Sequence, residues 1–106
     1  MDHVALLNAA LEYIRKHAVE HESQFALISG CAAFLRQQSD VSDETASRLA
    51  VQALGEFERD LHDCYIDIGK STSNTIFIKS RKSGLSYAFT AARLLQLRRC
   101  HAIPIP

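Results

Sequence analysis

The segment CYIDIGKSTSNTIFIKSRKSGLSYAFT, residues 64–90, breaks the helical spacing of apolar residues that holds through residue 63. Polar and apolar residues alternate in three runs, Tyr65–Gly69, Thr75–Lys79 and Leu85–Thr90, which are rich in β-branched and aromatic side chains. Polar residues 70–74 and the run 80–84 separate these stretches and are typical of turns. The segment therefore predicts a three-stranded antiparallel β-meander.

Three helices are expected before this segment. Asp2, Ser23 and Ser42 are each suited to cap a helix N-terminus, and Asp43 and Glu44 add negative charge at the positive end of the third helix. The predicted helices span residues 3–18, 24–38 and 43–63. Their expected apolar positions are Val4, Leu7, Leu11, Ile14 and Ala18 in the first, Phe25, Ile28, Cys31, Ala32, Phe34 and Leu35 in the second, and Ala46, Leu49, Ala50, Ala53, Leu54, Phe57 and Leu61 in the third.

One short helix is expected after the meander. Thr90 is suited to cap a helix over residues 91–100, although a single helix over 85–100 is an alternative interpretation of the same residues. Pro104 and Pro106 end the pattern, so residues 101–106 are predicted to be a tail. The predicted fold is α+β and mainly helical, a single domain 1–106 with an acidic helical part (1–63), a β-meander (64–90), a helix (91–100) and the tail.

Length and composition define the class of protein. The chain has 106 residues, 47% of them hydrophobic and 23% charged, which fits one globular core and excludes a wholly disordered chain. Its three cysteines are odd in number and widely spaced, unlike a disulfide-stabilised secreted domain. The N-terminus does not resemble a signal peptide, and no apolar run is long enough to span a membrane. We therefore expect a cytoplasmic protein that makes no membrane contact.

The formal net charge of zero conceals a division along the chain. Residues 1–67 hold all twelve acidic residues and five basic ones, whereas residues 68–106 hold seven basic residues and no acidic one. Two interpretations follow. The two parts either neutralise each other within the fold, or present oppositely charged surfaces to partners.

Two short motifs resemble catalytic or nucleotide sites but lack the context that such sites need. The run from His17 to His21 has the His-x-x-Glu-His arrangement of a zinc protease, but no carboxylate beyond Asp67 is present to act as a downstream ligand. Gly69-Lys70-Ser71 matches the end of a phosphate-binding loop, but a predicted strand follows it where a helix is required. Neither motif therefore predicts an active site.

The cysteines and histidines give little support to a metal site or a nucleophile. A scattered zinc set from His62, Cys64, Cys100 and His101 lacks the short Cys-x2–4-Cys pair typical of structural zinc. Cys31 and Cys64 are expected to be small core residues, and Cys100 to be the most reactive thiol. The sequence predicts no enzyme, no metal and no cofactor.

The hypothesis that remains is a small non-enzymatic interaction module, a regulator, adaptor or inhibitor of the kind found in phages and mobile elements, that binds a partner protein through charged surfaces. The alternative is a nucleic-acid-binding regulator that uses the basic C-terminal part. Homo-oligomerisation through the leucine-rich last helix is a third hypothesis. The candidate binding residues are Lys79, Arg81, Lys82, Tyr87, Arg93, Arg98 and Arg99, with an acidic face of Glu56, Asp60 and Asp63. Phe77 and Phe89 are instead expected to point into the core.

Overall fold

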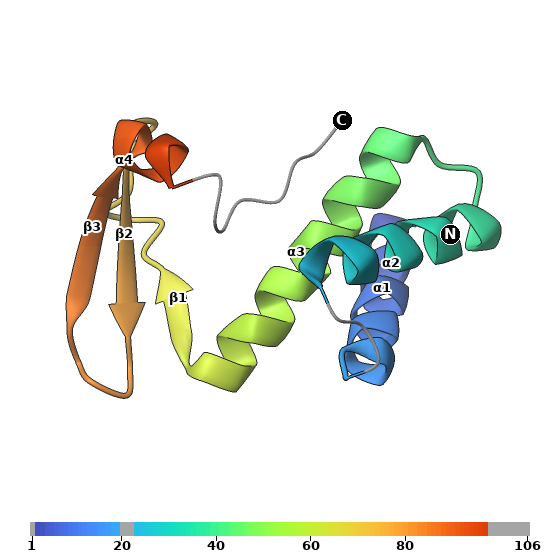
Figure 1. The fold of residues 1–106 in the computed structure, drawn as a ribbon, viewed down its shortest axis with the longest axis horizontal. Coiled ribbons are helices and arrows are strands. Elements are labelled where there is room, and N and C mark those ends of the chain that lie inside the picture. The colour runs from blue at the N-terminus through green and yellow to red at the C-terminus, as the bar shows by residue number, and fades with distance from the viewer. Residues whose placement is uncertain (1, 20–22, 98–106) are drawn as a thin grey trace. The chain divides into compact units, whose positions relative to one another are not determined.

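The computed structural model describes residues 2–19 and 23–97 (Figure 1). The chain divides into two compact units, with the boundary between Phe57 and Glu58. We call the described residues up to Phe57 the helical unit and residues 58–97 the β unit. The expectation of a single domain stays a prediction.

Three helices begin as their capping residues predict. The bounds are α1 His3–His17, α2 Gln24–Gln38 and α3 Asp43–His62, and α3 crosses the boundary between the two units. The Asp2 carboxylate accepts the Ala5 N–H at 2.7 Å, and the Ser42 hydroxyl accepts the Thr45 N–H at 3.1 Å. These bonds satisfy backbone donors that have no partner within the first turn of a helix.

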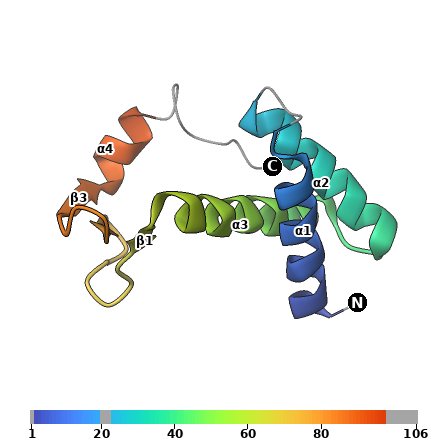
Figure 2. The same ribbon diagram turned by 90° about the horizontal axis from the view of Figure 1, so that it is seen from below.

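The core of the helical unit is one cluster of buried side chains from α1, α2 and α3. α1 and α2 lie beside the first half of α3 in both views (Figure 1 and Figure 2). Every buried residue of the described chain belongs to this cluster: Leu6, Ala10, Ile14, Leu27, Ile28, Cys31, Ala32, Leu35, Ala46, Leu49, Ala50, Ala53 and Leu54.

The buried face of α1 differs from the predicted stripe. Val4 is 66% exposed, whereas Leu6 and Ala10 are buried together with Ile14. The small Ala10 side chain allows close approach to α2, where the Cys31 thiol lies 3.7 Å from the Ala10 carbonyl oxygen and donates to it. The face of α1 that is buried is therefore the one that contains Ala10, and Val4 is exposed to solvent.

Near the start of α2 and the end of α3, residues on the predicted apolar faces lie outside the core. Phe25 is 63% exposed and Leu61 is 66% exposed, although both fall on the predicted apolar faces. The other positions expected in the core are buried or packed against it, including Phe34 and Phe57.

The β unit contains the predicted antiparallel meander. Its strands are β1 Cys64–Ile66, β2 Thr75–Ser80 and β3 Ser86–Thr90, in the order β1-β2-β3. Residues 86–90 are therefore a strand, and the alternative of a single helix over 85–100 is wrong. The predicted α+β fold, with three helices, three strands and a short last helix, is confirmed.

Strand β1 is shorter than the predicted run Tyr65–Gly69. The Asp67 carbonyl oxygen accepts the N–H groups of Lys70 and Ser71 at 3.2 and 2.9 Å, and its carboxylate also accepts from Lys70 at 3.2 Å. These bonds close a turn directly after the strand, because an aspartate side chain stabilises turns by bonding to nearby backbone.

Helix α4, Ala91–Gln96, follows β3 without a loop. Thr90 caps it as predicted, since its hydroxyl accepts the Arg93 N–H at 3.2 Å. The Leu97 N–H donates to the carbonyl oxygens of Arg93 and Leu94, which closes the last turn of the helix. Residues 98–100 of the predicted helix, and the predicted tail, lie outside the described residues. Within the described chain, no helix has both the length and the apolar character needed to cross a bilayer.

Candidate interaction surface

Three of the predicted binding residues gather at one end of the β-sheet. Lys79 lies near the end of β2, and Arg81 and Lys82 lie in the turn that leads to β3. The turn is fixed by the Gly84 N–H, which donates to the Ser80 carbonyl oxygen at 2.9 Å. Gly84 has a φ of 73°, a conformation that glycine adopts without strain.

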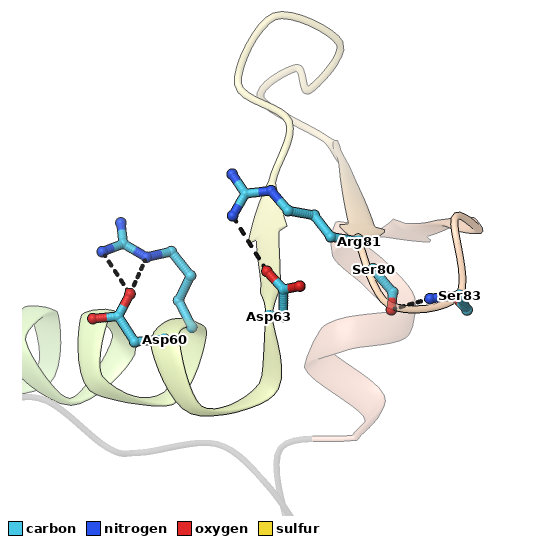
Figure 3. Close-up of polar contacts among 6 residues, drawn as sticks. Asp60, Asp63, Ser80, Arg81 and Ser83 are labelled. Atoms are coloured by element: carbon cyan, nitrogen blue, oxygen red, sulfur yellow. Dashed lines mark hydrogen bonds and ion pairs between the residues drawn. The ribbon is translucent and has the colours of Figure 1, made fainter.

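Arg81 is paired within the β unit (Figure 3). Its Nη1 lies 3.3 Å from the Asp63 Oδ1, and its guanidinium carbon lies 4.6 Å from the centre of the Tyr65 ring. The Arg81 backbone N–H also donates to the Asp63 carbonyl oxygen at 3.0 Å. Both side chains of the ion pair are more than half exposed, so the pair adds little to stability. Its effect is to neutralise the central cation of the predicted patch.

The other predicted residues do not extend this cationic end. Tyr87 pairs with Ile78, so it lies on the opposite face of the sheet from Lys79. Arg93 lies in α4, which begins after the last residue of β3, whereas the turn with Arg81 and Lys82 precedes the first residue of β3. Arg98 and Arg99 lie outside the described residues. The structure thus brings together Lys79, Arg81 and Lys82 and separates them from Tyr87 and Arg93.

The predicted acidic face is largely occupied by local ion pairs. Asp60 Oδ1 lies 3.2 Å from Nη2 of its neighbour Arg59, and Asp63 is the partner of Arg81 (Figure 3). Glu56 is half-buried and belongs to the helical unit. Asp63 also ends α3 with a φ of 52°, a left-handed conformation that aspartate tolerates better than most residues.

An apolar sheet face is the feature that the sequence analysis missed. Ile66 pairs with Ile78, Ile78 with Tyr87, and Ile76 with Phe89, and paired residues project from the same side of a sheet. This register places the apolar residues Cys64, Ile66, Ile76, Ile78, Tyr87 and Phe89 on one side together with the polar Ser80, and we define the apolar sheet face by those six apolar residues.

No residue of the apolar sheet face is buried in the described structure. Ile66 is 50% exposed and Tyr87 is 48% exposed, and the others are half-buried. Phe77 is also only half-buried, and it projects from the opposite face to Phe89. The expectation that Phe77 and Phe89 share a core is therefore wrong, because adjacent positions on paired strands alternate between faces.

The helical unit carries a surface hollow of about 530 Å³ beside the end of α1. Tyr13 stacks on Phe34 with ring centres 5.3 Å apart and lies 4.2 Å from the centre of the His17 ring. The charged residues that line the hollow are one carboxylate, Glu12, and two cations, Arg15 and Lys16.

The motifs that resemble metal sites gain no support. In residues 2–19 and 23–97, no three His, Cys, Asp or Glu side chains come together as a metal would require. Glu20 and His21 of the His-x-x-Glu-His run, and Cys100 and His101 of the scattered set, lie outside this part of the chain. Cys31 belongs to the buried core as predicted, whereas Cys64 is half-buried and lies outside that core, so the expectation of a core residue is wrong for Cys64; both are free thiols.

Comparison of the chain with models of protein families, with curated proteins and with solved structures finds no match.

Proposed function

We propose that this chain is a small non-enzymatic protein-interaction module of the cytoplasm, a regulator, adaptor or inhibitor, that binds an acidic partner protein on its apolar sheet face. One observation carries the proposal: the described β unit has six apolar residues on one sheet face and buries none of them. An apolar patch of this kind on a small protein is typical of a protein-binding surface. Burial of Tyr87 and the isoleucines against a partner would supply the favourable free energy.

The charge of the surrounding residues supports an acidic partner. The β unit, residues 58–97, contains six basic residues and four acidic ones, and two of the acidic ones, Asp60 and Asp63, are ion-paired. Lys70, Lys82 and Arg93 are exposed. Cations at the rim of an apolar contact attract carboxylates on the approaching partner, which raises the association rate more than the final affinity. The charged surfaces predicted from the sequence thus act here as the rim of an apolar contact.

The alternative, nucleic-acid binding through the basic part, has less support. Arg81 is paired with Asp63, and its guanidinium covers the Tyr65 ring on which a base could otherwise stack. Tyr87 lies on the opposite face of the sheet from Lys79. A phosphate-binding track needs cations and aromatic rings along one surface. The face opposite the apolar sheet face does carry Lys79 with Tyr65 and Phe77, but the Arg81 side chain beside Tyr65 is already paired with Asp63.

The test begins with site-specific photo-crosslinking in the source cell. A photoreactive phenylalanine at position 87 samples the apolar sheet face, and the same group at position 86 samples the opposite face of the same strand. We expect one protein to be captured from position 87 and not from position 86. Capture alone does not establish binding, so the captured protein is then purified and its affinity for the chain is measured.

Ile66→Asp is expected to weaken binding of that purified partner at least ~10-fold, because it places a charge within an apolar contact. Ser73→Asp, an exposed residue of the connection between β1 and β2, is the matched control and is expected to leave the affinity unchanged. Circular dichroism checks that both variants fold. Equal affinity of the Ile66→Asp variant and the wild type would contradict the proposal.

A parallel titration with labelled DNA and RNA at two salt concentrations tests the alternative. Tight binding that weakens steeply with salt, and that is lost in Arg81→Ala/Lys82→Ala, would support nucleic-acid binding and count against the apolar sheet face. We expect no such binding.

A further inference from the structure

Strand β3 is an edge strand without the features that usually prevent edge pairing. It is the outer strand of the order β1-β2-β3 (Figure 1). Residues 85–92, Leu-Ser-Tyr-Ala-Phe-Thr-Ala-Ala, contain no charged residue and no proline. Natural edge strands are generally kept from pairing by charges, prolines, bulges or short length.

The opposite edge is protected. β1 has only three residues, and Asp63 and Asp67 flank it. A second strand that approached β1 would meet a carboxylate at each end, so β3 is the edge open to pairing.

The hydrogen bonds to β2 identify which backbone groups of β3 are free to pair. The Ser80 N–H donates to the Leu85 carbonyl oxygen at 3.0 Å, and the Ala91 N–H donates to the Asn74 carbonyl oxygen at 2.8 Å. In an antiparallel ladder, bonded positions alternate along the strand. Positions 85, 87, 89 and 91 therefore face β2, and the N–H groups of Ser86, Ala88 and Thr90 point to the open edge.

These outward positions form a self-complementary set about Ala88. If two β3 strands pair antiparallel with Ala88 opposite Ala88, Ser86 of each copy lies opposite Thr90 of the other. All of these are outward-facing positions, as a hydrogen-bonded pair requires. Tyr87 then lies opposite Phe89 of the second copy, twice by symmetry, as an aromatic cross-strand pair. Few registers place polar with polar and aromatic with aromatic in this way.

We propose that two copies of this chain associate through β3, with Ala88 on the two-fold axis, to form a continuous six-stranded antiparallel sheet. The axis runs perpendicular to the sheet, so the apolar sheet faces of both copies lie on the same side. Such an interface is isologous, with the same surface used on both subunits. It uses β3 and not the leucine-rich last helix, and it does not depend on the proposed partner protein.

The same register predicts how association responds to salt. Beyond the paired residues 86–90, the turn of one copy comes next to the start of α4 of the other, which brings Lys82 toward Arg93 of the second copy. These like charges repel each other at the surface, and salt screens the repulsion. Association is therefore expected to strengthen as the salt concentration rises, the opposite of an interface built on ion pairs.

The mass in solution tests the association directly. At about 0.5 M salt, where surface charges are screened, light scattering is expected to give twice the chain mass of 11.8 kDa. Ala88→Pro removes an outward N–H without removing a bond to β2 and is expected to give the mass of one chain. Ala88→Val keeps the N–H and is expected to stay dimeric. Circular dichroism establishes that Ala88→Pro folds. A single-chain mass for the wild type, or a folded Ala88→Pro variant that stays dimeric, would overturn the proposal.

Disulfide formation tests the register. In a background with Cys64→Ser and Cys100→Ser, Ala88→Cys is expected to cross-link two chains readily under mild oxidation, because facing residues of a hydrogen-bonded pair lie within the range that a disulfide spans. Ala92→Cys, which lies in α4 outside the strand pairing, is the control and is expected to cross-link poorly. Equal cross-linking of the two variants would exclude this register. Since both tests use the chain alone, their results do not depend on whether the chain binds a partner protein.

Discussion

Leu35→Ala is expected to lower the free energy of unfolding by about 3 kcal/mol, within the range seen for deletion of a buried leucine side chain. Leu35 has no exposed surface, and it lies in the cluster formed by α1, α2 and α3. Removing its side chain deletes apolar contacts and leaves a cavity that helices already in close contact do not fill. In a small protein this is a large part of the total stability.

Chemical denaturation followed by circular dichroism measures this loss. Phe25→Ala is the matched control, since it removes a larger side chain from the same helix but one that is 63% exposed. We expect this control to change the free energy of unfolding by less than about 0.5 kcal/mol. If the two substitutions had equal effects, the core would not lie where the three helices place it.

The Cys31 thiol is expected to react with iodoacetamide about a thousand-fold more slowly in the folded protein than in the unfolded chain. Burial raises the pKa of Cys31 from 9.0 to about 12, because the thiolate loses its hydration in the apolar core. At pH 8 the reactive thiolate is correspondingly scarcer in the folded state. Mass spectrometry of the Cys31 peptide, with and without urea, gives the two rates. Similar rates would show that Cys31 is not in the core.

The raised pKa of Cys31 also predicts a pH dependence of stability. Between pH 9 and about 12 the unfolded chain has lost the Cys31 proton while the folded protein retains it. The contribution of the protonated Cys31 thiol to the free energy of unfolding is therefore fully present below pH 9. It is lost as the pH rises through this window, by an amount on the order of 4 kcal/mol. Chemical denaturation of the wild type and of Cys31→Ala at pH 8 and pH 11 gives the change in the free energy of unfolding with pH for each protein. The difference between the two changes is the part due to Cys31, because other titrating groups affect both proteins. An equal loss in the two proteins would contradict this assignment.

The local signals in the sequence predict the elements well. The bounds of α2 agree with the expectation from Ser23 to Gln38, and the caps at Asp2, Ser42 and Thr90 all form. Capping depends on residues within one turn of each other, so a sequence carries that information completely. The burial of α1 was harder to predict. Its face is set by the fit of Ala10 against Cys31, two residues that only the fold brings together.

The candidate surface was predicted less well, because it depends on strand register. Lys79, Tyr87 and Arg93 are close in sequence, yet the register places the first two on opposite faces and the helix places the third at the other end. The pairing of Arg81 with Asp63 joins residues 18 positions apart. The alternation of polar and apolar residues predicts the strands, but which side chains of neighbouring strands share a face depends on the register. What the alternation did not reveal is that no described residue of the β unit becomes buried.

Side-chain footprinting by hydroxyl radicals measures most directly whether the apolar sheet face is open in the free protein. We expect Tyr87 and Ile66 to be oxidised at rates close to those of the urea-unfolded chain, while Ile14 and Leu35 in the same sample are strongly protected. Protection of Tyr87 and Ile66 equal to that of Leu35 would mean that the face is already covered, and it would contradict its proposed role as a binding surface.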